Sequence, residues 1–95
     1  MQAVIRKYSG QGSAELLDLL EKRKADIQAT MQAVPGFVSY TLVRTDAGGV
    51  AVTVCQDQTG IEESTRRARE WIAQNARGIA AAAPEVSAGR VIARF

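Results

Sequence analysis

The 95-residue sequence predicts an α+β, ferredoxin-like domain of order βαββαβ, with a four-stranded antiparallel sheet and two helices on one face. Short β-branched stretches alternate with two longer stretches whose apolar residues follow a helical period. Turns rich in glycine or proline separate these stretches. The two middle strands are joined by a few residues only, so they should pair antiparallel. A chain of this length forms a single domain, residues 1–95.

The first half of the chain predicts one strand and one long helix. Residues 3–8 are β-branched and partly alternating, and the glycines of the following SGQG stretch predict a turn. Ser13 is expected to cap a helix that runs to Pro35-Gly36, where proline disfavours helical geometry in the residue before it. The inward face of this helix has apolar residues at spacings of three, four and seven. They are Leu16, Leu20, Ile27, Met31 and Val34.

The second half predicts a hairpin, a helix and a last strand. Residues 37–45 and 50–56 form the hairpin around a DAGG turn. Thr59 and Glu62 fit a capping box at the start of the next helix, and Gly78 should end that helix. A loop is expected over residues 79–84, and a strand over residues 85–95, kinked or bulged at Gly89. The inward stripe of the second helix is Ile61, Ser64, Ala68, Trp71, Ile72 and Asn75.

Composition excludes several classes of site. The chain has no histidine, which removes Ser–His and Cys–His nucleophile pairs, histidine-ligated haem and nearly all zinc or non-haem iron sites. We therefore expect neither a metal nor a cofactor. The single cysteine cannot form an internal disulfide. No stretch approaches the roughly 18 apolar residues of a membrane span, and the N-terminus has no apolar region after its positive charges. The expected location is cytoplasmic, without membrane association.

The second predicted helix carries a basic run that raises the question of a nucleic-acid partner. The run consists of Arg66, Arg67, Arg69 and Arg77. Glutamates interleave with these arginines, so Glu62–Arg66 and Glu63–Arg67 pairs should form on a solvated face. A net charge of +2 is also too small to predict such a partner. RNA-recognition domains share the strand order, but the third strand here lacks their aromatic side chains. We expect no nucleic-acid binding.

The predicted sheet has no clearly polar face. In the third strand, valines at positions 50, 52 and 54 point one way, and Ala51, Thr53 and Cys55 point the other. Helices cover only one face of such a sheet, so the other needs a second cover. We expect that cover to be a second copy of the chain, in a symmetric homodimer formed through the sheet face.

Three stretches carry a resemblance to a known family: VPGFVSYTLVR after the first helix, GGVAVTVCQDQ in the next strand, and the tryptophan-bearing STRRAREWI. Together with the strand order, they resemble the dimeric α+β-barrel superfamily, and within it the antibiotic biosynthesis monooxygenase-like proteins. The resemblance covers nearly all of the chain. It implies a homodimer whose two sheets form a barrel, with the helices outside and a pocket between sheet and helices.

The resemblance also implies a set of candidate site residues. Some members oxygenate aromatic substrates without metal or flavin, and use Trp, Asn, Tyr and Arg side chains to bind and deprotonate the ring. Residues of these types lie in suitable predicted elements. Trp71 and Asn75 are on the second helix, Tyr40 is on the second strand and Arg90 is on the last strand. The haem-degrading members rely on an axial histidine, which this chain lacks. The substrate expected from the resemblance is a small aromatic molecule.

Each candidate also has a purely structural interpretation. Trp71 can anchor the helix to the sheet, Asn75 can cap the helix end, and Tyr8 and Tyr40 can be ordinary strand residues. Cys55 would be reactive only if a cation or helix N-terminus lowered its pKa, and free cysteine is often a small buried hydrophobe. The sequence identifies no catalytic residue.

Three hypotheses for function remain open. The first is a small-molecule-binding dimer that acts as a cofactor-free monooxygenase-like enzyme on an aromatic substrate. The second is a non-catalytic dimeric ligand-binding or accessory protein. The third, an amino-acid-binding module of the ACT type, shares the strand order but usually accompanies a catalytic domain, and none is present here.

Overall fold

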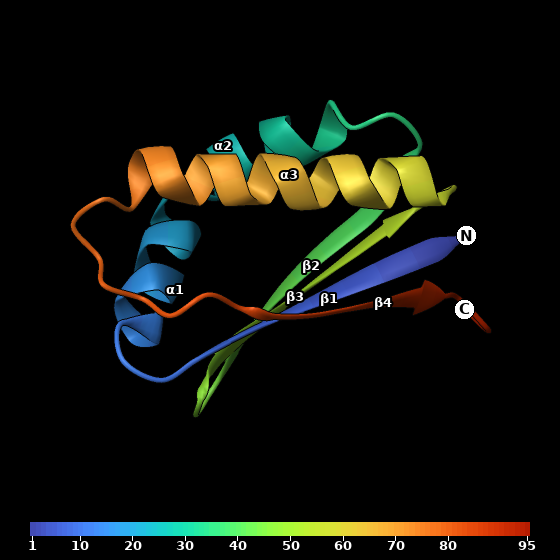
Figure 1. Ribbon diagram of the computed structural model, residues 1–95. Helices are drawn as coiled ribbons and strands as arrows, with labels where there is room; N and C mark the ends of the chain where they lie inside the picture. The colour runs from blue at the N-terminus through green and yellow to red at the C-terminus, as the bar shows by residue number, and fades with distance from the viewer.

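Four antiparallel strands form the sheet, in the order β2-β3-β1-β4. The computed structural model describes residues 1–95, and all helices lie on one side of the sheet (Figure 1). This arrangement confirms the predicted ferredoxin-like fold, with the first helix in two pieces. The elements in chain order are β1 (Gln2–Ser9), α1 (Ser13–Lys22), α2 (Lys24–Gln32), β2 (Phe37–Thr45), β3 (Gly48–Cys55), α3 (Gln58–Asn75) and β4 (Glu85–Arg90).

The core lies between the helices and the inward face of the sheet. Strand alternation turns every second side chain towards the helices, and α1 supplies the largest fully buried side chains opposite them, Leu16 and Leu17. The buried strand residues include one charged side chain, that of Arg6, which is 2% exposed. The inward strand residues are Val4, Arg6 and Tyr8 of β1 and Ala51, Thr53 and Cys55 of β3.

The first helix is divided at Arg23, which corrects the expected single helix. A straight helix would place Lys24 one turn after Leu20, on the buried face, where an unpaired charge is costly. At Arg23 the backbone leaves helical geometry (φ −107°, ψ 28°), and both charged side chains become exposed. Buried residues resume at Ile27 in α2. The break lets one apolar stripe continue across two helices.

Both predicted N-caps are also corrected. Gly12 precedes α1 with φ 82°, and the Ser13 hydroxyl instead donates to the carbonyl oxygen of Gly10 at 2.7 Å. Asp57, not Thr59, caps α3: its carboxylate accepts from the Gly60 amide at 3.0 Å. Aspartate caps helices better than threonine does. The capping box does not form, because the Glu62 carboxylate accepts from Gln58 at 3.3 Å.

The edge strands differ from expectation in two places. β4 ends at Arg90, which pairs with Gln2, the first residue of β1, so no neighbouring strand continues beyond it. The irregularity expected at Gly89 lies instead in β2, between Phe37 and Ser39. The extra residue of a bulge reverses the alternation. Phe37 therefore packs against the same core as Tyr40.

The helices cover the sheet unevenly. α3 packs mainly over β1 and β3, whereas every residue of β4 is exposed. In Figure 1 the chain leaves α3, runs down beside α1 and enters β4 below α3. Residues of α3 and β4 line two adjoining cavities, which share Thr65, Arg69 and Val86. None of the helices combines the length and the apolar character that a bilayer crossing requires.

Candidate functional site

A cavity of about 360 Å³ lies between α3, the inward face of the sheet and the segment that follows α3. Ala68 and Ile72 of α3, with Ala76 just after it, form one wall, and Arg6 and Tyr8 of β1 form the base. The opposite wall belongs to residues 79–84, which have no helix or strand structure. The volume lies in the range of small-molecule pockets, and the mostly apolar walls are typical of them.

The space exists because the wall opposite α3 is built of small side chains. Residues 79–84 read IAAAAP, and the alanines at positions 81, 82 and 83 all line the cavity. No helix covers β4, so a space remains beside α3. The methyl groups of the alanines are too short to fill it. Larger apolar residues in the same segment would fill the cavity and make it core.

Arg6 is the polar feature of the cavity base. It comes from the middle of β1, where alternation places it between Val4 and Tyr8 on the inward face. Its Nη2 donates to the Thr53 hydroxyl oxygen at 2.9 Å, while Nε and Nη1 donate to no protein atom. None of the ion pairs of the chain includes Arg6. A buried guanidinium thus keeps two donor nitrogens free.

Two tyrosines lie beside Arg6, and both stay protonated near neutral pH. Burial raises the pKa of Tyr8, although the positive charge of Arg6 opposes the shift. Burial likewise raises the pKa of Tyr40 to about 12 against the same opposing charge. A phenol with such a pKa is a hydrogen-bond donor rather than a general base at neutral pH. The polar end of the site therefore donates hydrogen bonds.

A much smaller cavity, of about 10 Å³, lies on the Tyr40 side of Arg6. It shares Arg6, Tyr8, Ala68 and Ile72 with the larger one and is also lined by Tyr40 and Trp71. Its volume suits at most a water-sized group. The structure therefore brings two of the sequence-predicted site residues, Trp71 and Tyr40, together with Arg6.

The other two predicted residues lie elsewhere. Asn75 is the last residue of α3; its side-chain nitrogen donates to the Trp71 carbonyl oxygen at 2.9 Å, and its oxygen accepts from Arg23 at 3.5 Å. Arg90 is exposed at the end of β4 and lines neither cavity. On Trp71, the Arg23 guanidinium lies 5.6 Å from the ring centroid, close enough for a cation–π contact.

Cys55 packs as a small hydrophobe. It is fully buried in a cluster with Val4, Val34 and Ile61. Burial, and then the carboxylate of Asp57, raise the pKa of the thiol. Since a reactive cysteine needs a lowered pKa, the environment of Cys55 favours packing over chemistry.

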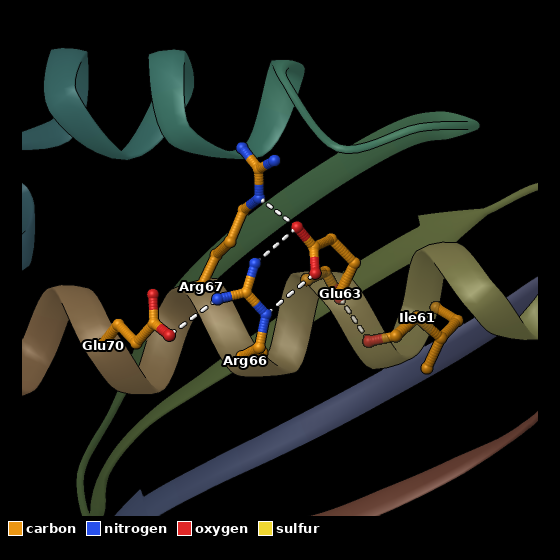
Figure 2. A network of polar contacts seen from close by, with 6 residues as sticks. Ile61, Glu63, Arg66, Arg67 and Glu70 are labelled. Atoms are coloured by element: carbon orange, nitrogen blue, oxygen red, sulfur yellow. Dashed lines mark hydrogen bonds and ion pairs between the residues drawn. The ribbon is translucent and has the colours of Figure 1, made fainter.

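The basic run on α3 is largely neutralised by neighbouring carboxylates (Figure 2). Glu63 accepts from Arg66 at 2.7 and 2.9 Å and from Arg67 at 2.8 Å, while Arg66 also donates to Glu70 at 2.7 Å. The predicted Glu63–Arg67 pair is present. Arg66 pairs with Glu63 and Glu70 rather than with Glu62, whose carboxylate accepts from Gln58.

This network predicts acid sensitivity. Hydrogen bonds from Arg66, and then from Arg67, lower the pKa of Glu63 from 4.5 to about 2. The folded state therefore binds this proton less readily than the unfolded chain, so the network stabilises the fold at neutral pH and loses its effect as pH falls through this range. Thermal unfolding scans between pH 7 and 2 should show a smaller loss of Tm for Glu63→Gln than for the parent protein.

Glu85→Gln is the matched control for that experiment, because Glu85 is exposed and makes no ion pair. Its Tm should fall with pH as steeply as that of the parent protein. Equal acid sensitivity of Glu63→Gln and the parent would contradict a stabilising role for the network.

Sequence reasoning missed two features of the site. Arg6 lies in a strand whose two faces both carry apolar residues, so composition alone does not show which face is buried. The alternation of Val4, Arg6 and Tyr8 was a usable signal, since Val4 and Tyr8 are typical inward strand residues. The second feature is the alanine run over residues 80–83, for which the sequence predicts only a loop. Its lack of bulky side chains beside an edge strand was the signal for a cavity.

Comparison with known proteins places the chain by its fold. No protein-family model matches the sequence, and no curated protein matches it. Among solved structures, SnoaB of Streptomyces nogalater, a cofactor-independent oxygenase, has a TM-score of 0.64 at 21% identity, over 99% of this chain and 94% of that one. The heme-degrader MhuD of Mycobacterium tuberculosis has a TM-score of 0.71 at 19% identity, over 100% of this chain and 99% of that one.

A third structure is described as a dimeric ferredoxin-like protein from an uncultured marine organism. Its TM-score is 0.67 at 12% identity, over 99% of this chain and 94% of that one. The fold and the cavity define this chain as a ferredoxin-like α+β domain with a ligand-sized space between sheet and helices. It shares its fold with these three structures, which confirms the resemblance at the level of fold.

Proposed function

We propose that this protein binds a small aromatic molecule in the 360 Å³ cavity beneath α3 and acts on it as a cofactor-independent, monooxygenase-like enzyme. The observation that carries the proposal is the cavity itself: apolar walls enclose a ligand-sized space with one concentrated polar end. Such a combination is typical of small-molecule sites. The similarity to an oxygenase that works without a cofactor supports the choice of reaction.

The proposal assigns different roles to the residues around the cavity. The α3 wall and residues 79–84 would contact the ring system, because the side chains that line the cavity there are mostly apolar and many of them are alanines. Tyr8 would donate a hydrogen bond to a ligand oxygen, while Tyr40, which lines only the smaller cavity, would lie behind this polar end. Trp71 would support this polar end from the smaller cavity. Heme degradation is not proposed, because the chain has no histidine to ligate the iron.

A non-catalytic ligand-binding role is the second candidate, and a specific observation favours it. The raised pKa values of Tyr8, Tyr40 and Cys55 keep all three groups protonated near neutral pH. No carboxylate lines the cavity. The protein therefore offers no general base there, and an oxygenation reaction would depend on a substrate that ionises readily by itself.

The test combines ligand binding with oxygen uptake. Calorimetric titration with a panel of anthrone- and quinol-like compounds should detect binding to the parent protein. Ala68→Phe should weaken that binding at least about tenfold, since Ala68 lines both cavities and a ring placed there would occupy the space of the ligand. Ala25→Phe, at an exposed position of α2, is the matched control and should bind like the parent.

The outcomes separate the two candidates. Oxygen uptake by the parent protein and by Ala25→Phe, but not by Ala68→Phe, would support the enzyme. Binding without oxygen uptake on any compound would favour the non-catalytic role. If no compound of the panel binds, or if Ala68→Phe binds as well as the parent while circular dichroism shows it folded, the proposed site is wrong.

We also propose that the protein is a homodimer formed through the outward face of the sheet. The side chains of Ile5 and Val43 are 43% and 46% exposed on that face, and the partly exposed Val50 and Val52 lie beside them. Beyond β4, Ile92 and Phe95 are almost completely exposed in the single chain. A second copy would cover this apolar surface.

A further inference from the structure

We infer that the ligand of this cavity carries a carboxylate, and that the buried guanidinium of Arg6 binds it. This inference rests on the proposed ligand site but not on any reaction there. It narrows the ligand from an aromatic molecule to an aromatic acid. Three observations lead to it: the unpaired state of Arg6, the absence of acidic side chains from the cavity, and the hydrogen-bond donors around its polar end.

The position of Arg6 has no explanation in the stability of the fold. The side chain is 2% exposed; its Nη2 donates to the neutral Thr53 hydroxyl, and its other neighbours, the Tyr8 and Tyr40 hydroxyls, are also uncharged. Buried charges are normally paired, because the loss of hydration is otherwise uncompensated. The free Nε and Nη1 therefore indicate a partner outside the chain, and Arg6 lines the cavity in which such a partner would bind.

The protein does not supply the missing negative charge. The carboxylates that form ion pairs all pair with other arginines on the helices and β2. The only charged residues that line the cavity are Arg6 at the base and Arg69 at the exposed rim. Both of these charges are positive, which favours entry of an anion.

The groups beside Arg6 fit an oxygen anion. Tyr8 is 4% exposed, and its hydroxyl, like that of Tyr40, can donate a hydrogen bond. A carboxylate has two oxygens that accept several such bonds, and arginine–carboxylate bonds are among the strongest in proteins. The apolar walls beyond this end suit a hydrocarbon ring. The whole cavity thus matches a ring with a carboxylate attached.

The test compares two ligands that share one ring system. The probes are 2-naphthoate, which is anionic at pH 7.5, and 2-naphthalenemethanol, which is neutral. Calorimetric titration should show that the parent protein binds naphthoate at least about tenfold more tightly, the ratio expected when one charge-assisted hydrogen bond is added. Arg6→Met should abolish this preference while still binding the neutral alcohol, and Arg6→Lys should retain part of it.

Arg77→Met provides the matched control, because Arg77 lies just beyond α3 and does not line the cavity; it should keep the full preference. If the parent protein binds both probes equally, or if Arg6→Met keeps the preference, the inference is wrong and the proposed apolar site stands. If neither probe nor the anthrone- and quinol-like panel binds, the proposed site itself is wrong, and the inference falls with it.

Discussion

Replacing Arg6 by methionine and Thr53 by valine together should raise the free energy of unfolding by about 1–3 kcal/mol, the cost of leaving buried polar groups unpaired. In the ligand-free protein the guanidinium is buried with two unpaired donor nitrogens. Exchanging a buried charge for an apolar side chain of similar length is often stabilising. Valine removes the Thr53 hydroxyl, which would otherwise lose its only hydrogen-bonding partner.

Urea unfolding at a fixed protein concentration measures this effect, since association would otherwise shift the midpoint. Arg6→Met alone should raise the free energy of unfolding by less than the double variant does, because the fully buried Thr53 hydroxyl remains without its Arg6 partner. Arg69→Met, at the exposed rim, should change the free energy of unfolding by less than about 0.5 kcal/mol. A double variant less stable than the parent would show that Arg6 stabilises the ligand-free fold.

Charging the outward face of the sheet should convert the proposed dimer into a monomer. Val52 pairs with Ile5 on one side and Thr41 on the other, so it lies near the middle of this face. Val52→Lys would place two like charges close together across a two-fold interface and remove apolar contact area. We expect the dissociation constant to rise at least about 100-fold, since like charges at an interface cost several kcal/mol.

Size-exclusion chromatography with light scattering at micromolar concentration gives the mass of each form. The parent should have twice the 10.2 kDa mass of the chain, and Val52→Lys that of a single chain. Gln74→Lys, exposed on α3, is the control and should remain dimeric. A monomeric parent protein would contradict the proposed dimer, and a dimeric Val52→Lys would place the interface elsewhere.

The order of the elements could be predicted because it depends on local periodicity. The ends of the elements could not be predicted, because more than one nearby residue is able to begin or end each element. Asp57 and Thr59 are both able to cap a helix, and only the packing of Gly60 against Pro35 and Cys55 shows where α3 begins. The division at Arg23 depends on the cost of burying Lys24, which is decided by tertiary contacts.

The site was predictable only in part, for a related reason. Trp71 and Tyr40 line the smaller cavity because each lies on an inward face. Asn75 lies one helical turn after Trp71, but α3 ends at Asn75. The side-chain amide of Asn75 therefore donates to the backbone carbonyl oxygen of Trp71 and not to a ligand. Arg90 lies at the end of an edge strand that α3 does not cover. Arg6 was missed because, in a sheet with two semi-apolar faces, alternation alone does not say which face is buried.

The alanine wall over residues 79–84 has a consequence for how such a protein can change its specificity. These residues belong to no helix or strand, so their side chains shape the cavity without supporting the sheet ladder or the helical hydrogen bonds. A single exchange of alanine for a larger or polar residue would resize the binding space at little cost to folding. Substitutions in this segment, natural or engineered, can thus change the ligand specificity while the rest of the fold stays unchanged.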